Sequence, residues 1–165
     1  MYTSDKNEII HYADSMLHDA FIFLAAGILS AVFGLIYEIF SHEVYSYYMI
    51  YAFLILLVPG ALLNLLIVWL AVRKEKELRY GVEAEETAGF FFPGRFTRHA
   101  WNSGLAALTV GSIFKGVLDI YGTTNKLIAV YPAAAAVLIS AAVISFSMSY
   151  AAIRKMRRET ETSSI

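Results

Sequence analysis

Four long runs of apolar residues, separated by short turns or polar segments, dominate the sequence. They cover about residues 17–40, 46–72, 101–121 and 127–153. An α-helix rises about 1.5 Å per residue, so about 20 apolar residues are enough to cross a hydrocarbon core about 30 Å thick. We therefore predict an all-α integral membrane protein with four transmembrane helices, in which residues 1–165 form a single transmembrane domain.

The second half of the sequence repeats the first. A shift of 81 positions (99 minus 18) places residues 18–74 on residues 99–155 without a gap. The scarce polar residues support this alignment, because a histidine falls on a histidine, an acid on an acid, and an Arg-Lys pair on another. Internal repeats are common in membrane transporters. Each repeat holds two spans, so we predict a four-helix bundle of two tandem, same-orientation repeats related by a pseudo-two-fold axis along the membrane normal.

Composition agrees with a membrane protein and narrows the classes of function. The chain is 58% hydrophobic and only 16% charged, whereas a typical soluble domain is about 25% charged. It has no cysteine, which excludes disulfides, thiolate metal sites and cysteine nucleophiles. No phosphate-binding loop, GxSxG, HExxH or nucleic-acid-binding pattern is present in the sequence. We therefore expect neither an enzyme nor a nucleic-acid-binding protein.

Lysine and arginine are concentrated at one end of the predicted helices. The 73–99 segment carries six of them and the C-terminal tail carries four, whereas the turns at 41–46 and 122–126 carry one between them. Cytoplasmic loops of membrane proteins carry an excess of these residues. We therefore predict that both termini and the 73–99 loop are cytoplasmic, that both turns face outward, and that the protein lies in the cell membrane.

The cytoplasmic segments also suggest partners. The stretch from Phe90 to Phe96 is too apolar for a free loop, so we expect it in the membrane interface, with Arg95 and Arg98 on lipid phosphates. Packing of this stretch against the cytoplasmic helix ends is the alternative. The 73–99 loop and the basic C-terminal tail are the surfaces through which a cytoplasmic protein partner would dock.

The outward ends of the first and third spans hold the densest set of functional side chains. Glu38 and His42 are one helical turn apart, and Asp119 is the repeat equivalent of Glu38. Lys115 lies one turn before Asp119, inside the hydrocarbon, where a charge costs about 2.5–3.5 kcal/mol on insertion scales. We predict that Glu38, Lys115, Asp119 and His42 line a pathway for a proton, an ion or a small solute.

Two other interpretations of this cluster stay open. Carboxylates and imidazoles are ordinary ligands of zinc and similar ions, so Glu38, His42 and Asp119 also form a candidate site for a divalent metal. Alternatively the charges anchor the helix ends in the headgroup region among the surrounding tyrosines, and Lys115 extends its ammonium to the interface.

Three histidines mark the opposite end of the spans. His18 and His99 are repeat equivalents, and His11 lies two turns before His18. Paired histidines in a four-helix membrane bundle can ligate haem iron or another metal. Solvated polar helix starts are the alternative interpretation.

The duplication, the intramembrane Lys115 and the Glu38/Asp119 pair favour a subunit of a small-solute or ion transporter or channel. The alternatives are a non-transporting accessory or sensor subunit and a haem- or metal-binding redox protein. A four-helix bundle of this size encloses little lumen, so we expect a homo-oligomer, dimer or higher. The small residues of the 127–153 span are a candidate contact, because they let helices approach closely.

Overall fold

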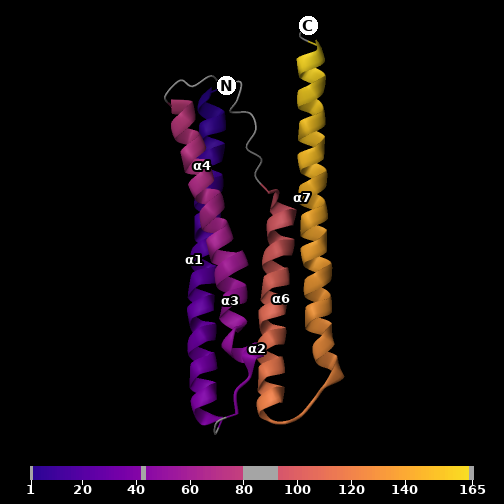
Figure 1. The fold of residues 1–165 in the computed structure, drawn as a ribbon. Helices are drawn as coiled ribbons and strands as arrows, with labels where there is room; N and C mark the ends of the chain where they lie inside the picture. Colours follow the sequence, from indigo (N-terminus) through magenta and orange to yellow (C-terminus); the bar gives the residue numbers. More distant parts are fainter. Residues whose placement is uncertain (1, 42–43, 80–92, 164–165) are drawn as a thin grey trace.

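A computed structural model describes residues 2–41, 44–79 and 93–163 (Figure 1). The predictions for His42 and for the Phe90–Phe92 part of the loop therefore lie outside the described residues. The described chain is helical apart from short turns, which confirms the predicted all-α class. Four segments are long and apolar enough to cross a membrane: Ile10–Phe40, Tyr47–Arg73, Arg95–Ile120 and Lys126–Lys155.

The four spans are built from continuous and from broken helices. The first is part of α1 (Tyr2–Phe40) and the third is α6 (Arg95–Ile120). The second is broken into α2 (Tyr47–Ile50), α3 (Ala52–Leu56), the π-helical η1 (Leu57–Leu62) and α4 (Leu63–Arg79). The fourth is a 3₁₀ turn, η2 (Lys126–Ala129), followed by α7 (Val130–Ser163). Chain reversal after α6 uses Gly122 at φ 65°, a left-handed conformation that glycine adopts without steric cost.

Both described ends of the chain and the start of α6 point to one end of the molecule, which we call the terminal end (Figure 1). The opposite end, where both short turns lie, is the turn end. The spans match the predicted apolar runs to within one residue at the turn end. At the terminal end the first and third spans begin several residues before those runs, because helix continues through polar sequence.

The break in the second span occurs at Pro59 and Gly60. Proline has no N–H to donate, so the regular i→i−4 pattern fails there and a π-helical turn replaces it. Two side chains bond to the carbonyls of this turn: Trp101 Nε1 donates to the Pro59 oxygen at 3.0 Å, and Asn64 Nδ2 donates to the Gly60 oxygen at 2.7 Å. Gly60 has no room for a Cβ, which would lie 2.7 Å from the Phe23 ring. The broken helix is therefore held by both α1 and α6.

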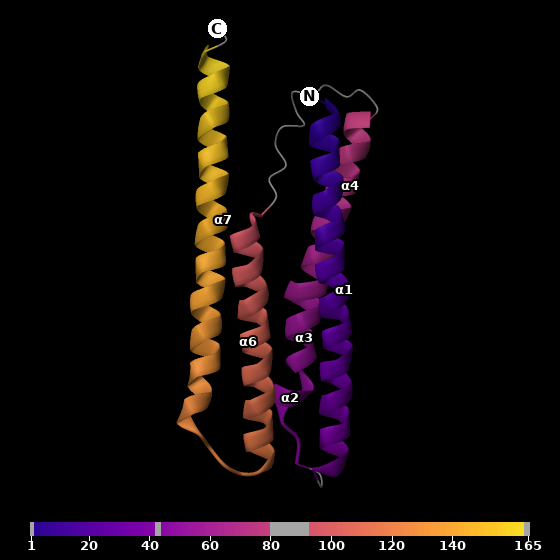
Figure 2. The ribbon, with the colours of Figure 1, turned by 180° about the vertical axis from the view of Figure 1, so that it is seen from behind.

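By backbone contacts the four spans follow one another in a row, while side chains also join α1 directly to α6. The predicted four-helix bundle stays a prediction. The order α1, α2–α4, α6, α7 is seen from both sides of the molecule (Figures 1 and 2). Apart from η2 in its own hairpin, α7 packs on α6 and makes no comparable contact with another element of the described chain. A two-fold axis would pair the α3–α6 contact with an equivalent contact between α1 and α7. The described elements show no comparable α1–α7 contact, so the pseudo-two-fold relation stays a prediction.

Glycines let the two hairpins approach closely near the turn end. Met49, which is 1% exposed, lies between Gly34 of α1 and Gly116 of α6. A Cβ at Gly116 would lie 2.7 Å from Met49 Cβ, and one at Gly34 would lie 3.3 Å from the Met49 oxygen. Near the turn end the buried contact between the hairpins is therefore centred on Met49 of α2, while a second buried cluster joins Phe23, Leu56 and Leu105 further along the helices.

Candidate functional site

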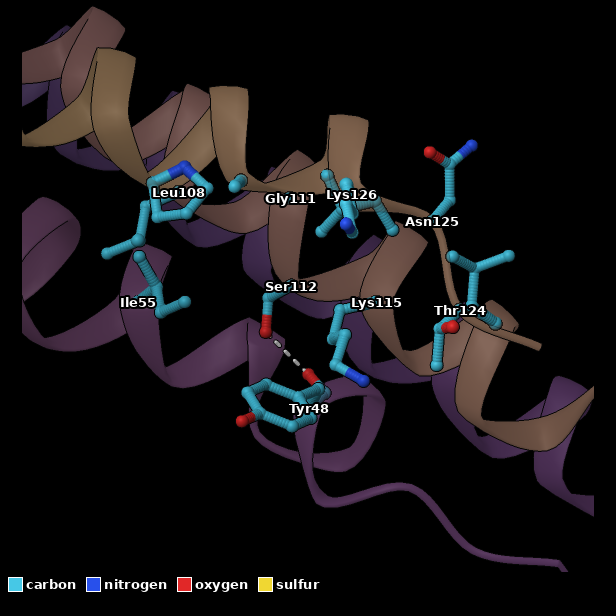
Figure 3. A pocket seen from close by; sticks show the side chains of 13 residues that line it. Tyr48, Ile55, Leu108, Gly111, Ser112, Lys115, Thr124, Asn125 and Lys126 are labelled. Carbon is cyan, nitrogen blue, oxygen red and sulfur yellow. Dashed lines mark hydrogen bonds between the residues drawn. The ribbon is translucent and has the colours of Figure 1, made fainter. Parts of the chain in front are cut away.

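A pocket of about 590 Å³ opens at the turn end, between α2–α3, α6 and the start of the fourth span (Figure 3). One part of its lining is polar and consists of Tyr48, Ser112, Lys115, Thr124, Asn125 and Lys126. The rest is apolar or backbone and consists of Ile55, Leu108, Gly111, Leu118, Ile128, Ala129 and Pro132.

The two hairpins differ at this pocket. Under the 81-residue shift Lys115 corresponds to Gly34, where α2 lies directly against α1. A lysine side chain does not fit in such a close contact. In this region α7 approaches α6 most closely one turn earlier, at Gly111. A Cβ there would lie 2.5 Å from Tyr131 Cβ. The second hairpin therefore leaves space around Lys115 that the first hairpin fills with Met49.

The ammonium of Lys115 is held by two neighbours. It forms an ion pair with Asp119, one turn later on α6, and lies 5.5 Å from the centre of the Tyr48 ring. A cation this close to an aromatic face is attracted by the ring quadrupole. The lysine side chain is 35% exposed and that of Asp119 is 29% exposed, so the pair is reachable from outside.

Two hydrogen bonds fasten this part of α6 to the second span. Ser112 Oγ donates a hydrogen bond to the backbone oxygen of Tyr48 at 2.7 Å, which is visible in Figure 3. Ser46 Oγ donates to Asp119 Oδ2 at 3.3 Å, while the other carboxylate oxygen pairs with Lys115. Asp119 therefore positions the lysine and also ties α6 to the turn before α2.

The structure brings together only part of the predicted turn-end cluster. Lys115 and Asp119 are in contact, whereas Glu38 is not among the residues that line the pocket. The buried Oε1 of Glu38 has no hydrogen-bond partner within the described residues. His42 lies outside those residues. No three histidine or acidic side chains come together in the described part of the chain, and the divalent-metal site stays a prediction.

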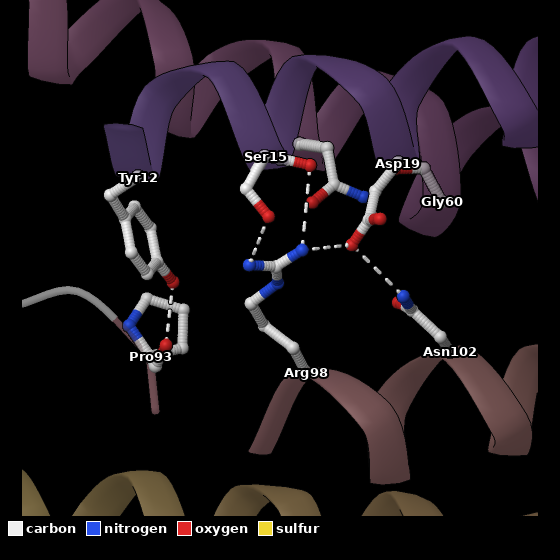
Figure 4. A network of polar contacts seen from close by, with 8 residues as sticks. Tyr12, Ser15, Asp19, Gly60, Pro93, Arg98 and Asn102 are labelled. Carbon is white, nitrogen blue, oxygen red and sulfur yellow. Dashed lines mark hydrogen bonds and ion pairs between the residues drawn. The ribbon is translucent and has the colours of Figure 1, made fainter. Parts of the chain in front are cut away.

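A second polar site lies at the terminal end and joins α1 to α6 (Figure 4). Arg98 Nη2 lies 2.7 Å from Asp19 Oδ2, and Arg98 Nη1 donates to Ser15 Oγ at 2.8 Å. Asn102 Nδ2 donates to the same Asp19 oxygen at 3.1 Å. The side chains of Arg98 and Asp19 are only 16% and 18% exposed, so this ion pair is largely buried.

The two arginines that were predicted to contact lipid phosphates differ in their surroundings. Arg98 uses its guanidinium within the protein, on Asp19 and Ser15, and also lies 5.6 Å from the ring centre of Tyr12. Arg95 has an exposed side chain at the start of α6, which fits a lipid phosphate contact. Asp19 is not among the residues expected from the sequence, although an acid within the first turns of an apolar run is a signal for a buried ion pair.

The three histidines at this end lie on the surface. His11, His18 and His99 are all exposed. His18 precedes Asp19 and His99 follows Arg98. These two histidines are therefore adjacent in sequence to the ion pair, but neighbouring residues of a helix point to different sides of it. Their role as ligands of haem or another metal stays a prediction.

Comparisons with protein-family models, curated proteins and solved structures find no match to this chain. The geometry of the two polar sites therefore carries the functional argument. Each site has an ion pair with space beside it: about 590 Å³ at the turn end and about 390 Å³ beside Arg98 and Asn102 at the terminal end. The turn-end pocket is the larger of the two, and its ion pair is the more exposed, at 35% and 29% against 16% and 18%.

Proposed function

We propose that this protein is a subunit of a membrane transporter or channel for a small solute or ion, and that the turn-end pocket is its solute-binding site. The observation that supports this function is the open space beside Lys115, a lysine within a membrane-spanning helix. The pocket volume of about 590 Å³ lies within the range of about 300–1,000 Å³ typical of small-molecule sites.

The position of Lys115 inside a membrane span supports a functional role rather than a purely structural one. An ammonium within the hydrocarbon costs energy, and ionisable residues there usually mark substrate or ion pathways. The first hairpin shows that the same helix position is compatible with a glycine and close packing, since Gly34 occupies it. In the proposal Lys115 contacts the solute, Asp119 holds the ammonium in place, and Glu38 and His42 serve as proton or ion contacts at the same end.

Replacing Lys115 with methionine is expected to reduce solute flux at least about tenfold, because it removes a charge contact worth more than about 1.4 kcal/mol while keeping side-chain length. The measurement is the initial flux into proteoliposomes under imposed gradients of protons, potassium, chloride, acetate, glutamate and octanoate. Lys155→Met is the matched control, since Lys155 is exposed at the other end of α7 and far from the pocket in sequence.

Equal flux in Lys115→Met and wild-type vesicles would contradict the role of the pocket. Absence of flux for every gradient in wild-type vesicles would instead favour the accessory or sensor subunit, which docks a partner through the 73–99 loop or the C-terminal tail. Correct folding of both variants is checked by elution volume in detergent and by helical circular dichroism.

The orientation belongs to the same proposal: both termini are cytoplasmic and the protein lies in the cell membrane. Both chain termini lie at the same end of the molecule, which fits this orientation. The four lysines and arginines between residues 154 and 158 of α7 lie toward that end as well. Alkaline phosphatase, which is active only outside the cytoplasm, is expected to be inactive when fused after Ile165 and active when inserted after Thr123 in a bacterial host. The reverse pattern would contradict the orientation without affecting the pocket.

A homo-oligomer is also part of the proposal. The fourth span has the fewest buried residues, 11% of its most apolar window, and packs on α6 alone. Its exposed small residues include Ala133, Ala134 and Ala136, which would let a helix of another copy approach closely.

A further inference from the structure

The charges that line the turn-end pocket have one sign. Lys115 and Lys126 both contribute to the lining, from α6 and from the start of the fourth span respectively. No carboxylate of the described residues is in the lining; Asp119 contacts Lys115 from the same helix and also accepts a hydrogen bond from Ser46. Lys115 and Lys126 outnumber the one described carboxylate that contacts either of them, so the described part of the pocket carries net positive charge and favours an anion.

Neutral polar groups stand at the same rim. Asn125 uses its Oδ1 to accept from the Leu127 N–H at 2.9 Å, which leaves its amide NH₂ as a donor. Thr124 and Tyr48 add hydroxyl groups to the lining. Donors of this kind, set beside ammonium groups, match the oxygen atoms of a carboxylate or phosphate.

The opposite part of the pocket is hydrophobic. Ile55, Leu108 and Ile128 line it from three different elements, and the helices that carry them are membrane spans. A fully hydrated inorganic anion would leave these side chains uncovered, whereas a hydrocarbon tail would cover them. Burial of apolar surface contributes about 25 cal/mol per Å², so the tail adds affinity that a small inorganic anion lacks.

We infer that the pocket binds an amphiphilic organic anion, with its carboxylate or phosphate group on Lys115 and Lys126 and its hydrocarbon part against Ile55, Leu108 and Ile128. This inference rests on the proposed function, since it assigns the substrate class of the same site. The anionic group competes with Asp119 for the ammonium of Lys115, and Asp119 keeps its hydrogen bond from Ser46. The ligand is either a soluble organic anion or the headgroup and upper chain of an anionic lipid.

The test uses radiolabelled octanoate and the full-length protein in a neutral maltoside detergent, with protein-free micelles as the blank. Octanoate is expected to bind at least about tenfold more tightly than octanol, because octanol lacks the charge. Lys126→Gln should weaken octanoate binding about tenfold; this exposed residue in a short turn can be changed without disturbing the packed helices. Lys155→Gln, which removes the same charge outside the pocket, should leave binding unchanged.

Equal binding of octanoate and octanol would overturn the inference, as would octanoate binding that Lys126→Gln and Lys115→Met leave intact. Nanodiscs distinguish the two sources. Loss of octanoate binding in phosphatidylglycerol discs but not in phosphatidylcholine discs supports a lipid anion, and equal binding in both supports a soluble one. Binding without flux would overturn the transport proposal alone, whereas inorganic ion flux without octanoate binding would overturn this inference alone.

Discussion

Asp19→Ala is expected to lower the free energy of unfolding by about 3–5 kcal/mol, because it leaves the guanidinium of Arg98 buried without its counter-charge. Arg98 is 16% exposed, and its buried Nε has no hydrogen-bond partner among the described residues, so the arginine has little access to water when Asp19 is removed. Unfolding in mixed micelles can be followed by the fluorescence of Trp101, which lies on the same helix one turn from Arg98, with the other tryptophan, Trp69, replaced by phenylalanine in every variant.

The Lys155–Glu159 pair provides the matched control. It joins residues one turn apart on α7 at 3.9 Å, with side chains 80% and 66% exposed. Exposed pairs contribute about 0–1 kcal/mol, so Lys155→Ala should hardly change stability. Replacing Asp19 with leucine and Arg98 with methionine together should recover most of the loss, since no charge stays buried. A single Asp19→Ala change as mild as Lys155→Ala would show that the ion pair does not hold the hairpins together.

Gly116→Ala is expected to destabilise the protein by about 1–3 kcal/mol through overpacking. The new Cβ would lie 2.7 Å from Met49 Cβ and 3.0 Å from the Met49 backbone nitrogen. The backbone fixes both atoms, so no change of the Met49 rotamer relieves the clash. The helices α2 and α6 must separate, which also weakens the hydrogen bond from Ser112 to the Tyr48 oxygen.

Gly94→Ala is the control for this substitution, because a Cβ at Gly94 meets nothing within 4 Å. Unfolding in mixed micelles, measured as for Asp19→Ala, should show little change for Gly94→Ala and a clear loss for Gly116→Ala. Equal stability of the two glycine variants would mean that the contact at Met49 is looser than described.

The spans and the pairing within helices follow from the sequence because they depend on neighbouring residues. An apolar run of sufficient length forms a membrane helix whatever its neighbours are, and Lys115 meets Asp119 because residues one turn apart share a helical face. The predicted ends of the spans at the turn end agree with the structure to within one residue for the same reason.

The contacts between helices could not be predicted in this way. Asp19 pairs with Arg98 only because α1 and α6 approach at the terminal end, and the sequence does not state which helices are neighbours. The pocket around Lys115 depends on the placement of α7 against Gly111 rather than against Lys115. The 81-residue shift identified Lys115 as the residue that departs from the repeat, but not the space that this departure leaves.

Among the spans synthesised before it, each span of this protein packs mainly on the one immediately preceding it. Contacts between segments close in sequence form quickly, since little chain entropy is lost in closing them. The first hairpin can therefore form while the rest of the chain is still on the ribosome, α6 can add to it, and α7 arrives last. The Asp19–Arg98 pair, which joins the third span to the first, can form only after α6 has been inserted beside the first hairpin.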